Sequence, residues 1–351
     1  MPERQENDLT NNIVVITGAS AGVGRAVAHR FARAGTSLAL IARDEASLEE
    51  TKLEVESLGG RAAIFPADVA DADAVFAAAE AIEDQLGPIE TWVNNAMTTV
   101  FSPLSKMKPE EFRRVTEVTY LGFVYGTMAA LRHMQPRARG TIVQVGSALA
   151  YRGIPLQSAY CGAKHAIRGF TDSLRSELLH DGSRIRLTMV HLPAINTPQF
   201  DWARAHIGHE PRPVAPVFQP GVAADAIFEA AQSAPRELWV GSSTSKVILG
   251  NMISPRFLDH YLARNAYHGQ ETAAPLQPGR DDNLFRPVPQ LHRTRGSFSR
   301  EASTSAVNLP GEAVRFAAVV IGVGLAATAG FFTHSAWRSS GRPRRSSWSS
   351  G

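Results

Sequence analysis

The sequence predicts an α/β fold built on a doubly wound parallel sheet. The first observation is a set of short apolar runs rich in β-branched residues, whose near-continuous apolar character fits strands buried on both faces. The runs span residues 13–17, 37–42, 62–68, 89–96, 141–146, 184–192 and 237–241. The second observation is that helix-length segments separate these runs, and repeated alternation of strand and helix is typical of such a sheet.

The helical segments carry start and stop signals that support this alternation. Residues 24–35 follow a glycine-rich turn after the first run. Residues 71–87 begin at Asp71, a good N-terminal cap, and end at Gly87 before a proline, which cannot continue a helix. The chain has 351 residues, 44% of them hydrophobic, which is enough for one large domain and additional segments.

The chain divides into five parts. Residues 1–12 are a polar N-terminal extension without the apolar core of a secretory signal. Residues 13–264 hold the alternating strands and helices. Residues 265–312 carry Pro, Gly, Ser and charge without sustained periodicity, so we expect a mostly disordered, flexible linker. An apolar C-terminal helix over 313–337 and a basic tail over 338–351 complete the chain.

The apolar segment predicts a single transmembrane helix. Residues 316–332 are seventeen uncharged residues, and the stretch reaches twenty-two at Trp337, whereas a helix needs roughly 20 to cross about 30 Å of hydrocarbon. Arg315 precedes the segment and Arg338 follows it, as flanking charges should. The alternative is an apolar helix docked on the domain or on a partner chain. Basic residues flank both sides, so the orientation stays open, with a cytoplasmic folded domain anchored to a membrane as our expectation.

Composition argues against several other classes. Net charge is only +3, and no nucleic-acid module accompanies the arginine-rich end, so we expect no nucleic-acid partner. The one cysteine, Cys161, excludes an internal disulfide and a cysteine-rich metal site, and suits a reducing compartment. His206 and His209 lie three apart without a third ligand in view, so we predict a surface pair and no metal site.

The first strand-to-helix turn predicts a dinucleotide site. Gly18, Gly22 and Gly24 are spaced G-x-x-x-G-x-G after a predicted strand and before a helix. A phosphate needs backbone N–H groups brought close, where a Cβ would obstruct it, and the helix N-terminus adds a positive dipole end. Thr17 and Ser20 supply hydroxyls nearby. The plain alternative is a tight turn into a helix.

The ends of the next strands indicate which dinucleotide it is. An acid at the second strand end would bind the adenosine ribose hydroxyls, but Ala42 and Arg43 stand here. The guanidinium fork suits a 2′-phosphate, which favours NADP(H), while Asp44 keeps NAD(H) open as the less favoured cofactor. Asp68 at the third strand end offers a carboxylate to the adenine amine. Asn94, at the fourth, either holds the cofactor side of the cleft or caps a turn.

The fifth strand leads to a candidate catalytic set. Ser147 lies just past the strand end, where α/β sheets place ligands; Tyr160 follows by thirteen residues and Lys164 by four more. Residues i and i+4 share a helix face, and a cation within roughly 4 to 6 Å lowers a phenol pKa. Tyr160 is therefore predicted to be the general acid/base, Lys164 to tune it, and Ser147 to stabilise the substrate oxygen.

In this order the motifs T-G-x-x-x-G-x-G, N-N-A, Ser and Y-x-x-x-K resemble the short-chain dehydrogenase/reductase family over residues 13 to about 240. The resemblance implies a Rossmann-type fold, nicotinamide-dependent hydride transfer between an alcohol and a carbonyl, and a homo-oligomer. It makes Ser147, Tyr160 and Lys164 catalytic, and residues 192–198 resemble its P-G-x-x-x-T loop. The cofactor positions that it implies are Gly18, Ser20, Gly22, Val23, Arg43, Asp68, Val69, Asn94, Tyr160, Lys164, Pro193 and Thr197.

The chain departs from the family pattern at three places. Thr119 stands where the family carries an Asn thought to hold a proton-relay water, and its hydroxyl has shorter reach. Met97 and Ala194 replace glycines of the N-N-A-G motif and of the loop. These changes leave open a rival of another class, a catalytically impaired NADPH-binding regulatory or scaffold protein at a membrane.

The residues expected around the mouth of the site predict the substrate class. They are Leu149, Tyr151, Ile154, Leu156, Phe200, Trp202 and Phe218. Their bulk and apolar character favour a bulky, apolar alcohol or carbonyl over a sugar or small acid. The alternative is that these side chains pack on each other and close the loop.

Overall fold

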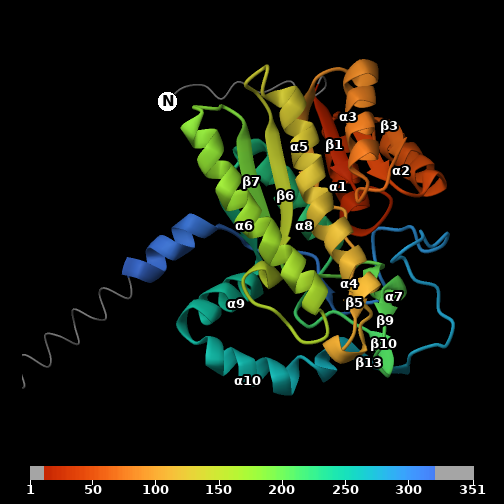
Figure 1. Cartoon of the computed structure of the whole chain (residues 1–351), viewed down its shortest axis with the longest axis vertical. Helices are drawn as coiled ribbons and strands as arrows, with labels where there is room; N and C mark the ends of the chain where they lie inside the picture. Colours follow the sequence, from red (N-terminus) through yellow and green to blue (C-terminus); the bar gives the residue numbers. More distant parts are fainter. Residues whose placement is uncertain (1–11, 321–351) are drawn as a thin grey trace, which may run out of the picture.

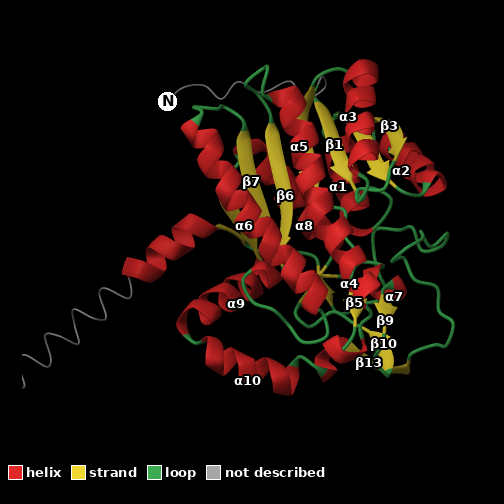
Figure 2. Cartoon of the chain, in the orientation of Figure 1, coloured by secondary structure: helices red, strands yellow, loops and turns green. Residues whose placement is uncertain are grey.

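The computed structural model describes residues 12–320, which are built around one eight-stranded sheet (Figures 1 and 2). The strand order is β15-β12-β7-β6-β4-β1-β2-β3. Neighbouring strands are parallel except β15, which runs antiparallel to β12. The chain therefore moves outward from β1 in one direction and from β4 in the other, which confirms the predicted doubly wound α/β fold.

The seven predicted strands are all present in this sheet, with an eighth, β15, contributed by the C-terminal region. The sheet strands are β1 (Ile13–Thr17), β2 (Ser37–Ala42), β3 (Arg61–Pro66), β4 (Ile89–Asn94), β6 (Thr141–Ser147), β7 (Arg186–Leu192), β12 (Glu237–Val240) and β15 (Asn308–Pro310). Shorter strands lie beyond the sheet: β5 (Val100–Phe101), β8 (Ala194–Ile195), β9 (Arg204–Ala205), β10 (His209–Pro211), β11 (Val217–Phe218), β13 (Glu271–Pro275) and β14 (Ala302–Ser303).

The helices follow the predicted alternation. They are α1 (Gly22–Ala32), α2 (Glu45–Ser57), α3 (Ala72–Leu86), α4 (Pro109–Thr116), α5 (Gly122–Met134), α6 (Ser158–His180), α7 (Gln199–Trp202), α8 (Pro220–Ser233), α9 (Gly241–Ile253) and α10 (Pro255–Asn265). A π-helical turn, Glu117–Leu121, joins α4 to α5. The predicted cap of α3 is confirmed, because the Asp71 carboxylate accepts a hydrogen bond from the Ala74 N–H at 3.1 Å.

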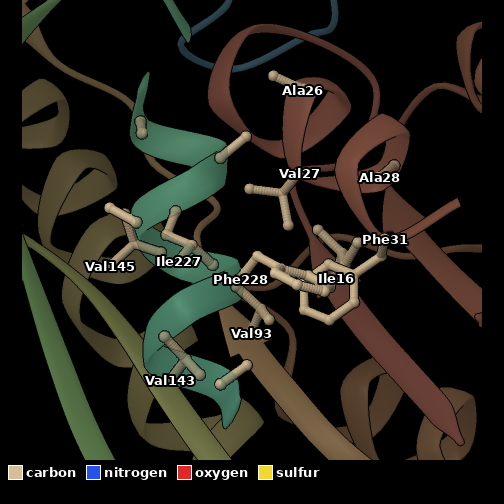
Figure 3. Packing of buried hydrophobic residues seen from close by; sticks show 14 of the residues in the cluster. Ile16, Ala26, Val27, Ala28, Phe31, Val93, Val143, Val145, Ile227 and Phe228 are labelled. Atoms are coloured by element: carbon tan, nitrogen blue, oxygen red, sulfur yellow. The ribbon is translucent and has the colours of Figure 1, made fainter. Parts of the chain in front are cut away.

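Two hydrophobic clusters cover the two faces of the sheet, because successive strand residues point to opposite sides. Val14 and Ile16 join the cluster formed with α1 and α8, whereas Ile13 and Val15 join the cluster formed with α3, α5 and α6. Figure 3 shows the first cluster, where α8 packs against α1 above the strands. There the Phe31 and Phe228 rings meet edge to face with centroids 4.9 Å apart. This packing fixes the strand ends that carry the site.

The flexible linker predicted over residues 265–312 is wrong. The segment carries β13, β14 and β15, and in Figure 1 part of it runs along the domain from the region of β13 toward α1. Leu284 is fully buried and Val288 is nearly so. Pairs of β15 with β12 and of β14 with β11 tie the segment to the domain through backbone hydrogen bonds. Single buried apolar side chains and backbone hydrogen bonds therefore hold this segment in a defined structure, although its composition is typical of a disordered segment.

The predicted transmembrane segment lies mostly outside the described residues. Residues 311–320 are helical and extend away from the domain (Figure 1), with Phe316, Val319 and Val320 exposed. Within residues 12–320, no helix combines the length and apolar character required to cross a membrane. Residues 321–337 and the basic tail 338–351 are not among those described.

Candidate active site

A cavity of about 710 Å³ lies at the carboxyl ends of the parallel strands. The turns after β1, β2, β3, β4 and β6 all border it, because parallel strands bring their carboxyl ends to one edge of the sheet. The glycine-rich turn lines this cavity, and so do Ser147, Tyr160 and Lys164. A single cavity thus joins the predicted dinucleotide site to the predicted catalytic residues.

The glycine-rich turn requires its glycines. Gly18 and Gly22 have φ values of +68° and +56°, in the left-handed region. A Cβ on Gly24 would lie 2.1 Å from the Gly18 carbonyl oxygen, so no side chain fits there. Gly18, Ser20, Gly22 and Val23 line the cavity at the start of α1. Glycine thus keeps side chains away from the backbone of this turn, where a dinucleotide phosphate would approach, and the Gly22 N–H donates to the Arg293 carbonyl at 2.9 Å.

Asn94 does not line the cavity, which corrects its predicted cofactor role. The side chain is fully buried and bonds Trp92, Thr127 and Gln144 at 2.8 to 3.0 Å. Its neighbour Asn95 lines the cavity instead, and its side-chain amide donates to the Thr17 carbonyl at 2.9 Å. Successive strand residues face opposite sides, so a shift of one position exchanges the two roles.

Charged residues line the part of the cavity where the adenosine was predicted to bind. Ala42, Arg43, Asp44, Asp68 and Val69 line it, as predicted. The Asp68 carboxylate forms an ion pair with Arg114, a residue that no sequence motif indicated. The Asp44 carboxylate caps α2 by accepting from the Ser47 N–H at 2.8 Å. Asp44 therefore caps α2, and Arg43 is the cationic side chain at the end of β2 that lines the cavity.

Ser147, Tyr160 and Lys164 come together at the other end of the cavity. Ser147 ends β6, and its hydroxyl oxygen accepts from the Leu149 N–H at 3.1 Å. Tyr160 and Lys164 lie on the first turns of α6, with the Lys164 Nζ 5.6 Å from the centre of the Tyr160 ring. The Nζ donates to the Val145 carbonyl at 2.8 Å. The i, i+4 spacing thus places both side chains on the face of α6 that meets β6.

Burial sets the acidity of this group. It raises the pKa of Tyr160 well above its ordinary value, with a further increase from Cys161 that a hydrogen bond with Ser147 opposes. Burial also lowers the pKa of Lys164 to about 7. The expected lowering of the Tyr160 pKa is therefore not present in this arrangement. With a pKa of about 7, Lys164 is about half protonated at neutral pH. Its charge therefore responds to the protonation state of the nearby buried phenol.

Thr119 lies in the π-helical turn and is fully buried. Its hydroxyl donates to the Thr98 carbonyl at 2.9 Å and accepts from the Thr98 N–H at 3.0 Å. The hydroxyl proton of Thr119 is thus used in the hydrogen bond to the backbone carbonyl of Thr98, which follows β4. Thr119 ties the irregular turn to the strand end, and only its second lone pair would remain for the predicted relay water.

The loop after β7 closes the cavity beside the glycine-rich turn. Pro193 and Thr197 line it as predicted, and a Cβ on Gly22 would lie 3.2 Å from the Thr197 side chain. Asn196, between them, was not predicted to matter. It is fully buried and donates to Gln219 and Ser299 at 3.2 and 3.1 Å. Asn196 therefore fixes the loop to the C-terminal region.

The substrate side of the cavity is mostly apolar. Leu149, Ile154, Phe200 and Trp202 line it, whereas Tyr151, Leu156 and Phe218 do not. The helices α9 and α10 add apolar residues that no sequence motif indicated: Val247, Phe257, Leu258, Tyr261 and Leu262. Their helices follow β12 directly, which brings them to the same edge of the sheet.

Tyr151 belongs to a buried polar group that also contacts the backbone of Ser147. Its hydroxyl donates to the Glu237 carboxylate at 2.5 Å, and Arg315 donates to both at 2.6 Å. His191, fully buried, meets the Ser147 carbonyl at 3.1 Å through Nδ1. Burial lowers the pKa of His191 to about 4, so the ring is neutral and its Nδ1 is the protonated donor.

The remaining sequence candidates have structural partners. His206 Nε2 lies 2.9 Å from the Glu111 carboxylate, and Cys161 is buried, where burial raises its pKa to about 11. Among residues 12–320 no group of three or more His, Cys, Asp or Glu side chains is arranged to hold a metal ion.

Comparison with known proteins identifies the family of the chain. The family model described as short chain dehydrogenase matches residues 12–207. An uncharacterized oxidoreductase, YxnA, of Bacillus subtilis is 31% identical over 322 residues, 90% of this chain and 89% of that protein. The chain therefore belongs to the short-chain dehydrogenase/reductase family and is an oxidoreductase of that family, which binds a nicotinamide cofactor and acts on small molecules.

Two further relatives carry more specific names. A fatty acyl-CoA reductase of Acinetobacter baylyi is 29% identical over 233 residues, 66% of this chain and 76% of that protein. A solved alcohol dehydrogenase from the archaeon Thermococcus sibiricus, complexed with 5-hydroxy-NADP, matches with a TM-score of 0.56 and 26% identity. It covers 65% of this chain and 95% of that one.

Proposed function

We propose that the chain is an NADP(H)-dependent oxidoreductase that interconverts a bulky, apolar alcohol and the corresponding carbonyl compound. One observation carries the proposal: the glycine-rich turn and the Ser147, Tyr160 and Lys164 side chains line the same cavity. A hydride donor bound along the turn would have its reactive end directed toward the phenol. The impaired scaffold alternative has no feature of its own in the described residues to favour it.

Ser147, Tyr160 and Lys164 each have a separate role in the proposed reaction. When bound, the nicotinamide supplies or accepts the hydride. In the reductive direction Ser147 donates a hydrogen bond to the carbonyl oxygen, and Tyr160 gives its phenolic proton to that oxygen as charge develops there. Protonated Lys164 stabilises the resulting phenolate, which its neutral form cannot do. The raised pKa of Tyr160 keeps the proton on the phenol until the substrate oxygen takes it.

The choice of NADP(H) rests on Arg43. Arg43 lines the cavity at the end of β2, while one carboxylate oxygen of the adjacent Asp44 caps α2. A planar fork of N–H donors matches a phosphate and offers little to a bare ribose hydroxyl. Gly18, Ser20, Gly22 and Val23 would hold the pyrophosphate, and Pro193 and Thr197 the nicotinamide side.

The substrate class rests on the apolar wall formed by Phe200, Trp202, Phe257 and Tyr261. The test is NADPH oxidation with two carbonyl panels, one of bulky apolar aldehydes and ketones and one of small charged carbonyls. We expect turnover with the first. Faster turnover with the second would contradict the substrate assignment.

Membrane anchoring and self-association are separate proposals. We propose that residues 313–337 anchor the catalytic domain to a membrane from the cytoplasmic side, on the strength of their sequence, and that the domain forms a homo-oligomer as the family suggests. The whole chain should pellet with membranes and need detergent for release, whereas a chain ending at residue 320 should not. Release of the whole chain by salt alone would refute the anchor.

A further inference from the structure

The C-terminal region contributes a strap, residues 282–299, that crosses the cofactor side of the domain. The strap leaves the substrate loop, where the Asn283 N–H donates to the Trp202 carbonyl at 3.1 Å. It ends at the loop after β7, where the Phe298 N–H donates to the Asn196 side-chain oxygen at 3.0 Å. Between these two points it passes over the ends of β2 and β3 and over the start of α1.

At the adenosine end the strap contacts the charged residues of the site. The Asn283 carbonyl accepts from Arg43 Nη2 at 2.6 Å, and the Leu284 carbonyl accepts from Arg114 Nε at 3.1 Å. Arg114 in turn pairs with Asp68. These carbonyls orient the Arg43 guanidinium but occupy only part of its five N–H donors, so the others remain for a phosphate.

At the glycine-rich turn the strap contacts the backbone of α1. The Gly22 N–H donates to the Arg293 carbonyl at 2.9 Å, and Arg25 donates to the His292 carbonyl. Gly22 is the first residue of α1, so the strap binds one of the N–H groups that the helix leaves unpaired. The contact fixes the strap against the turn that the sequence marked as the phosphate site.

Apolar anchors hold the strap down. Leu284 is fully buried in a cluster with Val100, Val115 and Ala159. Val288 is 7% exposed. Four strap residues, Asn283, Pro287, Val288 and His292, line the same cavity as Arg43 and Asp68. The strap is therefore the outer wall of the adenosine half of the cavity.

We propose that the strap completes the dinucleotide site: it retains the adenosine half of the cofactor and positions Arg43 for the 2′-phosphate. This inference rests on the proposed function for the identity of the cofactor. Because the strap bridges the cleft from the substrate loop to α1, a bound dinucleotide leaves only when the strap detaches. Cofactor release is then slow and depends on the anchoring of Leu284.

The test compares two Leu→Ala variants of the strap. Leu284→Ala removes the buried anchor, and Leu291→Ala, at a side chain that is 36% exposed, is the matched control. NADPH bound to the whole chain is displaced with excess NADP⁺, and the loss of its fluorescence gives the dissociation rate. We expect a 10- to 100-fold faster rate for Leu284→Ala and a change below twofold for Leu291→Ala. Equal rates in Leu284→Ala and wild type would overturn the proposal.

A second measurement uses the unmodified chain, so it does not depend on a variant that folds. Arg293 and Arg295 are exposed, but trypsin requires the flanking backbone to be released, so cleavage after these residues should report opening of the strap. NADPH should slow cleavage there at least tenfold, whereas faster cleavage with NADPH would show that the strap competes with the cofactor and would overturn the proposal. Binding of NADPH without reduction of any carbonyl would contradict the proposed function and leave both strap measurements valid. A chain that binds no nicotinamide dinucleotide would contradict both.

Discussion

Removal of the Arg315 guanidinium should destabilise the domain from its C-terminal end. Glu237 is 2% exposed, and its carboxylate accepts from Arg315 at 2.6 Å, from Tyr151 at 2.5 Å and from Trp239 at 2.9 Å. Arg315→Ala leaves a buried carboxylate with two neutral donors. A hydrogen bond to a charged group contributes about 1.5–3 kcal/mol, and the Arg315 side chain is 28% exposed, so water replaces part of the contact.

The expected loss is therefore about 2 kcal/mol, which corresponds to a fall in Tm of about 3 °C for a domain of this size. Burial alone would raise the pKa of Glu237, but the hydrogen bonds from Tyr151 and Trp239 and the charge of Arg315 lower it below its ordinary value. A carboxyl whose pKa is lowered on folding stabilises the protein above its unfolded pKa and loses that contribution as the pH falls. The difference between variant and wild type should accordingly shrink below about pH 4.

The assay is thermal unfolding of the chain ending at residue 320, at pH 7 and at pH 4. Arg256→Ala, on the exposed side of α10, removes the same charge and should leave Tm unchanged. Glu237→Gln combined with Arg315→Ala should recover part of the loss, because the buried charge is gone. An Arg315→Ala variant as stable as wild type at pH 7 would refute the reasoning.

Three further predictions concern the site. Arg43→Ala should weaken NADPH binding about ten- to a hundred-fold, since one charge-assisted contact contributes roughly 1.5 to 3 kcal/mol, and should leave NADH nearly unchanged in fluorescence titrations; equal losses would remove Arg43 from the 2′-phosphate. Thr119→Val loses both hydrogen bonds to Thr98 and should lower the free energy of unfolding in urea by about 1–3 kcal/mol, while Thr119→Ser keeps them; equal stability of the two variants would argue against this role. Burial lowers the pKa of Lys164 to about 7, so above pH 7 the folded chain binds fewer protons than the unfolded chain. The free energy of unfolding should therefore rise from pH 7 to pH 9. Lys164→Met should flatten that rise, and an unchanged slope would contradict the lowered pKa of Lys164.

The sequence predicted the parts of the fold that rest on continuous patterns. Most of the strands were identifiable because they are buried on both faces, and Tyr160 and Lys164 were placed together because their spacing fits one helix face. Asn94 and Asn95 were not separable, since the choice between them depends on a strand register that sequence alone does not determine.

The defined structure of the strap was not predicted, for a different reason. The strap is held by single buried side chains such as Leu284 and by backbone carbonyls that accept hydrogen bonds from Gly22 and Arg43. None of these contacts produces a periodic hydrophobic pattern in the sequence. Composition rich in Pro, Gly, Ser and charge resembles a linker whether or not the main chain finds partners. The buried Asn196, which fixes the strap to the loop after β7, could have been suspected only from the loop motif around it.

The central claim is that Tyr160 transfers the proton in an NADPH-dependent carbonyl reduction. The most direct measurement is single-turnover oxidation of bound NADPH by wild type and by Tyr160→Phe, with a bulky apolar ketone. Because general acid catalysis contributes roughly 10²- to 10⁴-fold, the variant should be slower by about that factor, while its affinity for NADPH stays within about twofold. A Tyr160→Phe variant that oxidises NADPH at the wild-type rate would contradict the account.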